Sequence, residues 1–65
     1  MTQPLAPRES EVLRLAAAGE DVAAIARHLF LSRGTVRNYL SSAVVKLGAR
    51  NRMDAVRIAR EGGWI

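Results

Sequence analysis

Residues that start and stop helices divide this chain into four short segments. Pro7 suits the first position of a helix, where its missing N–H costs nothing. Three later positions hold side chains that cap helix N-termini, namely Asp21, Ser32 and Asn51. Glycines that end helices stand at positions 19, 48, 62 and 63. The pattern predicts helices over about residues 7–18, 22–29, 33–47 and 52–61, and therefore an all-α fold, a compact four-helix domain.

Apolar residues recur at helical spacing within these segments, which gives each helix one face to bury. The expected core side chains are Val12, Leu13, Leu15, Ala16, Val22, Ile25, Ala26, Leu29, Val36, Leu40, Ala43, Leu47, Ala55, Ile58 and Ala59. Trp64 and Ile65 are expected to fold back over the open end of this core. The chain has 65 residues and no Cys, so it holds no disulfide, and its single His cannot hold a structural metal alone. Stability must come from helix packing and capping.

The third segment has a second face that differs from an ordinary solvent-exposed surface. Its members carry one charge and no acid, and they are Gly34, Arg37, Asn38, Ser41 and Ser42. Short hydrogen-bonding side chains without negative charge let a helix come close to a polar, negatively charged partner such as the major groove of DNA. Val45 falls on the same arc, either past the edge of such a partner or against a neighbouring protein surface.

Basic side chains are concentrated in the second half of the chain. Residues 31–65 hold seven Arg and Lys against two Asp and Glu, a net charge of +5, whereas residues 1–30 have a net charge of −1. This asymmetry indicates a polyanionic partner for the second half. The alternative is a solvated basic surface in a protein from an Arg-rich proteome, since nine of the ten basic residues are Arg.

Several function classes find no support in the sequence. The longest uninterrupted apolar run, residues 22–26, is too short to span a membrane. The N-terminus has neither the basic nor the apolar region of a signal peptide, so a cytoplasmic location is expected. No nucleophile and base stand within reach of each other, so neither an enzyme nor a cofactor is expected. Residues 1–4 are expected to be a disordered tail or an artificial junction before a single domain at 5–65.

A short helix, a tight turn and a longer basic helix over residues 22–41 form a helix-turn-helix pattern, which any three-helix domain can imitate. Three blocks make the pattern specific: PRESEVLRLAAAG at 7–19, IARHLFLSRGTVRNYLS at 25–41 and KLGARNRMDA at 46–55. With them the chain resembles the DNA-binding effector domain of the LuxR/NarL family of bacterial transcription regulators, a LuxR/GerE-type helix-turn-helix. The NYLS and GARNR motifs are most similar to those of response regulators of the DesR type, which belong to two-component systems.

The resemblance implies sequence-specific DNA binding, with the third helix, 33–47, as the recognition helix in the major groove. In the family's pattern three positions face base edges, and here they hold Arg37, Asn38 and Ser41. Further positions lie near phosphates, and here they hold Ser32, Arg33, Thr35, Lys46, Arg50 and Asn51. The residue chemistry agrees, since Arg37 can bind guanine O6 and N7 and Asn38 can pair with adenine. Ser41 stands where the family often has Lys, so one charge is missing there.

The resemblance also implies that two copies bind DNA together, with the fourth helix, 52–61, as the dimerisation helix. Its outward arc holds Met53, Val56, Arg57 and Arg60, for which the alternative is scattered exposed residues without a partner. The expected partners are double-stranded DNA with repeated half-sites, a second copy, an N-terminal receiver or sensor domain, and RNA polymerase. Neither a membrane nor a metal is expected.

Two other interpretations stay open at this point. A sigma-factor promoter-recognition domain has a similar GTV motif, although the KLGARNR motif that follows argues against this class of protein. A small helical protein-interaction module would instead dock the third helix on an acidic partner.

Overall fold

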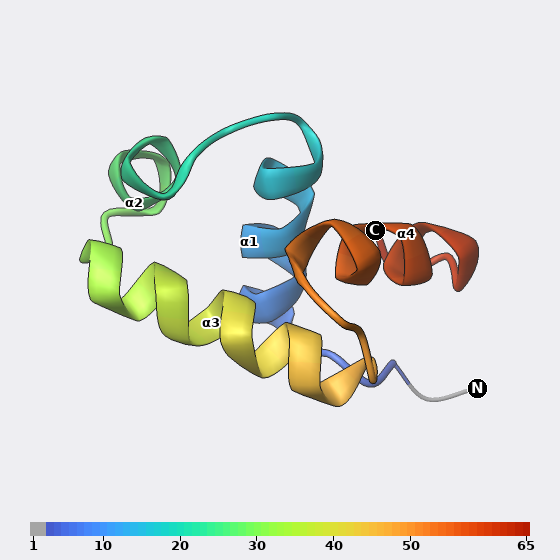
Figure 1. The fold of residues 1–65 in the computed structure, drawn as a ribbon. Coiled ribbons are helices and arrows are strands. Elements are labelled where there is room, and N and C mark those ends of the chain that lie inside the picture. The colour runs from blue at the N-terminus through green and yellow to red at the C-terminus, as the bar shows by residue number, and fades with distance from the viewer. Residues whose placement is uncertain (1–2) are drawn as a thin grey trace.

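The computed structural model describes residues 3–65 as four helices without a strand (Figure 1). They are α1 (Pro7–Ala17), α2 (Val22–Leu29), α3 (Arg33–Lys46) and α4 (Arg52–Glu61). The predicted all-α fold class is confirmed. α1 and α3 each end one residue earlier than expected, because Ala18 and Leu47 are already C-caps.

The expected tail at residues 1–4 is described only in part, since residues 1 and 2 lie outside the described residues. Gln3 accepts a hydrogen bond from the Leu5 N–H through its Oε1, at 3.3 Å, and Leu5 is buried in the core. Tertiary packing therefore reaches as far as Leu5.

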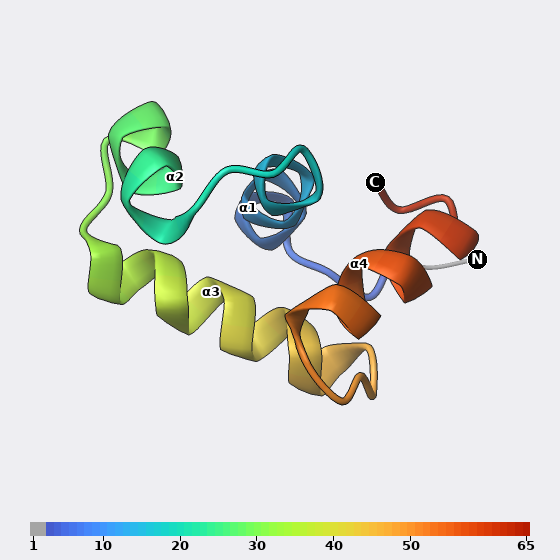
Figure 2. The same ribbon diagram turned by 45° about the horizontal axis from the view of Figure 1, so that its top comes forward.

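α1 and α3 are the elements around which the domain is built. Each of them contacts the three other helices, whereas α2 and α4 do not meet. Figures 1 and 2 show α2 and α4 on opposite sides of α1, with α3 running along all three. The longest helix, α3, is thus covered on one side by the rest of the domain and left open on the other.

Side-chain caps begin three of the helices, as predicted. The bonds run from the Ala24 N–H to Asp21 (2.8 Å), from the Thr35 N–H to Ser32 (3.1 Å) and from the Asp54 N–H to Asn51 (2.9 Å). At the start of α1, Ala6 has no side-chain oxygen, and the Glu9 carboxylate instead accepts from the Ala6 N–H at 2.8 Å. These bonds satisfy N–H groups that a helix start leaves without an intrahelical partner. The helix starts therefore follow from local chemistry.

The core is thin and aliphatic. Its buried hydrophobic residues are Leu5, Val12, Leu13, Ile25, Ala26, Val36, Leu40, Ala43, Ala55, Val56 and Ala59. Leu15, Leu29 and Leu47 are half-buried and pack against this cluster. Four of the eleven buried residues are Ala, which lets the helix axes approach closely.

The C-terminus folds back over the core, as predicted. Trp64 packs against the buried cluster, and its backbone N–H donates to the Ala59 carbonyl at 2.8 Å. A Cβ added at Gly62 would lie 2.6 Å from the Trp64 ring, so only glycine leaves room for the indole there.

The turn between α2 and α3 contains a strained residue. Phe30 adopts φ 57° and ψ 44°, in the left-handed region, where a side chain costs about 1–2 kcal/mol. Its side chain is 95% exposed, so burial does not offset this cost. The geometry lets the Leu31 N–H donate to the Ala26 carbonyl at 2.9 Å, which closes α2 and directs the chain into α3.

Candidate nucleic-acid interface

The outward face of α3 is exposed at four of the five polar positions that the sequence assigned to it. These four are Gly34, Arg37, Asn38 and Ser41. Ser42 departs from the expected arc, because it is half-buried and its hydroxyl donates to Glu9 Oε2 on α1. The three predicted base-contacting side chains therefore share one exposed surface, and Ser42 does not belong to it.

Glu9 is a buried carboxylate that joins the first turn of α1 to the last turns of α3. Besides Ser42, it accepts from Lys46 Nζ at 2.9 Å and from the Ala6 N–H. Burial raises the pKa of Glu9, but the hydrogen bonds from Ser42, Lys46 and Ala6 outweigh burial and hold it below its ordinary value of 4.5. Lys46, a predicted phosphate contact, thus already has an intramolecular partner, while 42% of its side chain stays exposed.

Three predicted phosphate contacts gather at the N-terminus of α3. The Ser32 hydroxyl donates to Thr35 Oγ1 at 2.9 Å, which leaves the Thr35 hydroxyl proton available. Arg33 is exposed and forms no ion pair within residues 3–65. Free N–H groups and the helix dipole favour an anion at such an end. Hydroxyl, guanidinium and backbone donors are therefore combined at one place.

The remaining predicted phosphate contacts, Arg50 and Asn51, lie in the turn before α4. The Arg50 backbone N–H donates to Asp54 Oδ2 at 3.0 Å, while its side chain is 86% exposed, with Nε 3.7 Å from the same oxygen. Asn51 uses its Oδ1 for the cap, which leaves its amide NH₂ free to donate. The Arg50 N–H and then Arg57 hold the pKa of Asp54 below its ordinary value. An ionised Asp54 thus fixes this turn.

The predicted dimer surface on α4 needs one correction. Met53 is 77% exposed, but Val56 is only 8% exposed and belongs to the core. α4 packs against both α1 and α3 and buries Ala55, Val56 and Ala59, whereas Ile58, which was expected to face inward, is only half-buried. The buried side of α4 is thus turned from Ile58 toward Val56. Val56 reaches the surface only as one wall of a shallow groove of about 380 Å³.

The two Arg residues of this surface are already engaged within the chain. Arg57 contacts Asp54 at 2.7 Å and Glu61 at 3.0 Å, and these partners raise its pKa. Arg60 Nη2 donates to the Ala17 carbonyl at 3.3 Å. The exposed apolar part of this face is therefore reduced to Met53.

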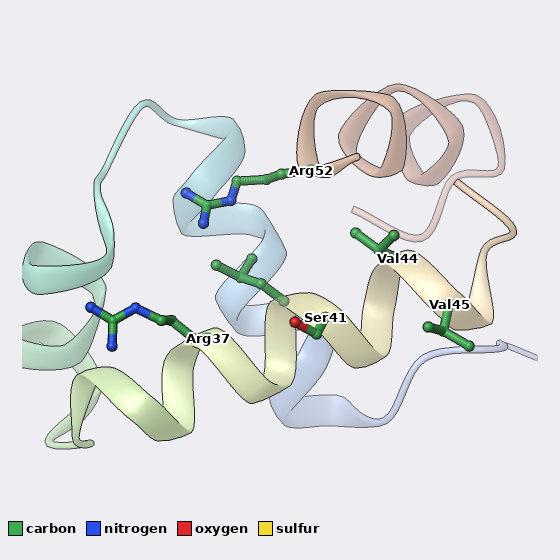
Figure 3. Close-up of a pocket in the computed structure, with 6 residues that line it drawn as sticks. Arg37, Ser41, Val44, Val45 and Arg52 are labelled. Atoms are coloured by element: carbon green, nitrogen blue, oxygen red, sulfur yellow. The ribbon is translucent and has the colours of Figure 1, made fainter. Parts of the chain in front are cut away.

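A shallow pocket of about 430 Å³ lies where α3 meets the beginning of α4. Its lining residues are Arg37, Leu40, Ser41, Val44, Val45 and Arg52. Figure 3 shows Arg37 and Ser41 on successive turns of α3, Val44 and Val45 one turn further, and Arg52 extending from α4. Arg52 was not among the residues predicted from the sequence. Its basic side chain at the start of the fourth helix, close in sequence to the basic residues of the third, was a usable signal.

Other kinds of site are not found in the described part of the chain. Residues 3–65 contain no group of three or more His, Cys, Asp or Glu side chains placed to hold a metal ion. None of the helices described is both long and apolar enough to cross a membrane.

Comparison with known families gives a match over most of the chain. The family model for bacterial regulatory proteins of the luxR family matches residues 3–59. The fold is similar to a solved structure of the transcription factor GerE, with a TM-score of 0.92 and 30% sequence identity, over 97% of this chain and 94% of that one.

Two full-length relatives are response or transcriptional regulators by name. The response regulator RamR of Streptomyces coelicolor is 59% identical over 94% of this chain and 30% of its own length. The transcriptional regulatory protein DesR of Bacillus subtilis is 46% identical over 94% of this chain and 31% of its own length. DesR is thus a relative, as predicted, although RamR shares more identical residues. The chain spans about a third of either relative.

Proposed function

This chain belongs to the LuxR family of bacterial regulatory proteins and is a helix-turn-helix DNA-binding domain of that family, and we propose that it reads DNA by placing α3 in the major groove. The observation that carries the proposal is the outward face of α3, which is exposed and free of acidic side chains while the opposite face is buried. Arg37, Asn38 and Ser41 are the base-reading side chains, because bidentate Arg and Asn contacts distinguish guanine and adenine there.

Phosphate contacts would fix the domain on the duplex. Support comes from the donors at the start of α3, which are Ser32, Arg33 and Thr35. In the turn before α4, the exposed Arg50 and the amide of Asn51 supply further donors. At the end of α3, Lys46 supplies the ammonium N–H groups that do not donate to Glu9. The role is one of binding and needs no catalytic step.

A second copy would bind alongside through α4, with Met53 at the centre of the contact and Val56, Arg57 and Arg60 around it. Half-sites would then lie about 10–10.5 base pairs apart, or a multiple of this. Because the chain spans about a third of RamR and DesR, we propose that an upstream receiver or sensor domain supplies the input signal. A bacterial regulator that binds DNA would act in the cytoplasm, and contact with RNA polymerase there is a further proposed role.

Selection of bound sequences from a random duplex pool tests this function. Arg37→Ala and Asn38→Ala should each weaken binding to the selected site by about 1–3 kcal/mol and relax the preference at one base pair. Arg14→Ala is the matched control, since Arg14 is an exposed arginine of α1 away from the α3 face. An unchanged affinity and base preference in Asn38→Ala would show that α3 does not lie in the groove.

A further inference from the structure

We propose that Val45 reads the methyl group of one thymine in the bound DNA, an inference that rests on the proposed placement of α3 in the major groove. Val45 is 79% exposed, on a helix whose apolar residues are otherwise mostly covered. Around the helix axis it points to the same side as the outward face, in the last turn of α3, because Gly34, Asn38, Ser41 and Val45 follow one another at spacings of four, three and four residues. The buried residues Val36, Leu40 and Ala43 follow the same spacing on the opposite side.

The pocket beside Val45 has the composition expected for a DNA edge. Leu40, Val44 and Val45 form its apolar part, and Arg37 and Arg52 stand at its margin (Figure 3). No acidic side chain lines it, and neither arginine forms an ion pair within residues 3–65. Two free guanidinium groups around an apolar centre complement a polyanion that carries an apolar group between its phosphates.

Thymine supplies that group. In the major groove the four base pairs present hydrogen-bond donors and acceptors, and only thymine adds a C5-methyl. An isopropyl side chain packed against a donor or acceptor would shield that polar group from water without offering a hydrogen bond in return, which is unfavourable. Val45 therefore favours a thymine methyl over the hydrogen-bond donors and acceptors of the base edges.

The spacing on α3 predicts where this thymine lies. Arg37 and Val45 are eight residues apart, about 12 Å along the helix axis. Base pairs rise about 3.4 Å along the duplex axis, and a path along the groove is longer per base pair because it also turns around that axis. The thymine should thus lie within about three base pairs of the base that Arg37 reads.

Replacement of thymine by deoxyuridine removes only the methyl group and so isolates this contact. Each thymine of the selected half-site is replaced in turn, and the affinity of the domain is measured for every duplex. The unmodified domain should bind one of these duplexes about fourfold more weakly, the effect of exposing one methyl-sized group. Val45→Ala should bind the thymine and uracil duplexes equally at that position.

Phe30→Ala is the matched control, because Phe30 is another exposed apolar residue, has no part in the proposed DNA or dimer contacts and does not line the pocket. It should keep the full dependence on the thymine methyl whatever its overall affinity. Thermal unfolding of Val45→Ala checks that the variant folds, which is expected because Val45 is exposed. Equal thymine–uracil ratios for the unmodified domain and Val45→Ala at every position would overturn the role of Val45 and leave DNA binding by α3 intact. A random pool that yields no preferred sequence would overturn the proposed function, and the role of Val45 with it.

Discussion

The two faces of α3 divide one helix into residues that hold it and residues that are open to a partner. On the inner face Val36, Leu40 and Ala43 are buried, and Ser42 and Lys46 are bonded to Glu9. On the outer face the side chains of Arg37, Asn38, Ser41 and Val45 are exposed. The inner face should therefore determine stability, and the outer face should determine binding.

A matched pair of Val→Ala substitutions tests this division most directly. Val36→Ala should lower the free energy of unfolding by about 2 kcal/mol, because Val36 is fully buried and its loss leaves a cavity. Val45→Ala, nine residues later on the same helix, should change it by less than about 0.5 kcal/mol. Denaturant unfolding of both variants measures the difference. Similar losses would mean that the outer face also contributes to the packing of the domain.

Glu9→Gln tests whether the polar contacts of the inner face are as important as its apolar ones. It should cost about 1–2 kcal/mol at pH 7, since hydrogen bonds to a charged, buried carboxylate are lost. Glu11→Gln is the control, because Glu11 makes only an exposed pair with Arg8 and should cost almost nothing.

The difference in stability between the unmodified chain and Glu9→Gln should depend on pH, in a direction that follows from the lowered pKa of Glu9. The ionised carboxylate stabilises the fold above its ordinary pKa of 4.5, and this contribution is lost as the pH falls through the lower folded value. The stability gap between the unmodified chain and Glu9→Gln should therefore narrow below about pH 4.5. A gap that stays constant down to acid unfolding would contradict the ionised state of Glu9 in the fold.

Phe30→Gly addresses an exposed position that nevertheless affects stability. Glycine removes the left-handed strain at this turn, but it makes the unfolded chain more flexible, so more conformational entropy is lost on folding. The net effect should be a gain of about 0.5–1 kcal/mol, measured by thermal unfolding. A loss of stability instead would show that the Phe30 side chain makes contacts that its 95% exposure does not indicate.

Much of the fold could be predicted from the sequence because its signals are local. Each of the caps at Asp21, Ser32 and Asn51 acts on an N–H three residues away, and each helix has its own apolar periodicity. The exposure of Arg37, Asn38 and Ser41 could also be predicted, since it depends only on their angle from the buried stripe.

The features that could not be predicted involve residues far apart in the chain. Glu9 is separated from Ser42 by 33 residues and from Lys46 by 37, and neither spacing leaves a trace in local sequence. The burial of Val56 depends on how α4 lies against two other helices at once. The conformation of Phe30 was missed for another reason. Glycine or asparagine is the usual sign of a left-handed residue, and neither stands in the turn between α2 and α3.

The contacts of Glu9 also bear on the order in which the domain assembles. They close a segment of nearly forty residues, and the entropy cost of joining two chain positions grows with the flexible length between them. Helix formation in α2 and α3 shortens that path, because a helix rises only about 1.5 Å per residue. Closure at Glu9 is therefore least costly once the helices exist, and we expect it late in folding. The final orientation of α3 would then be fixed in one of the last steps.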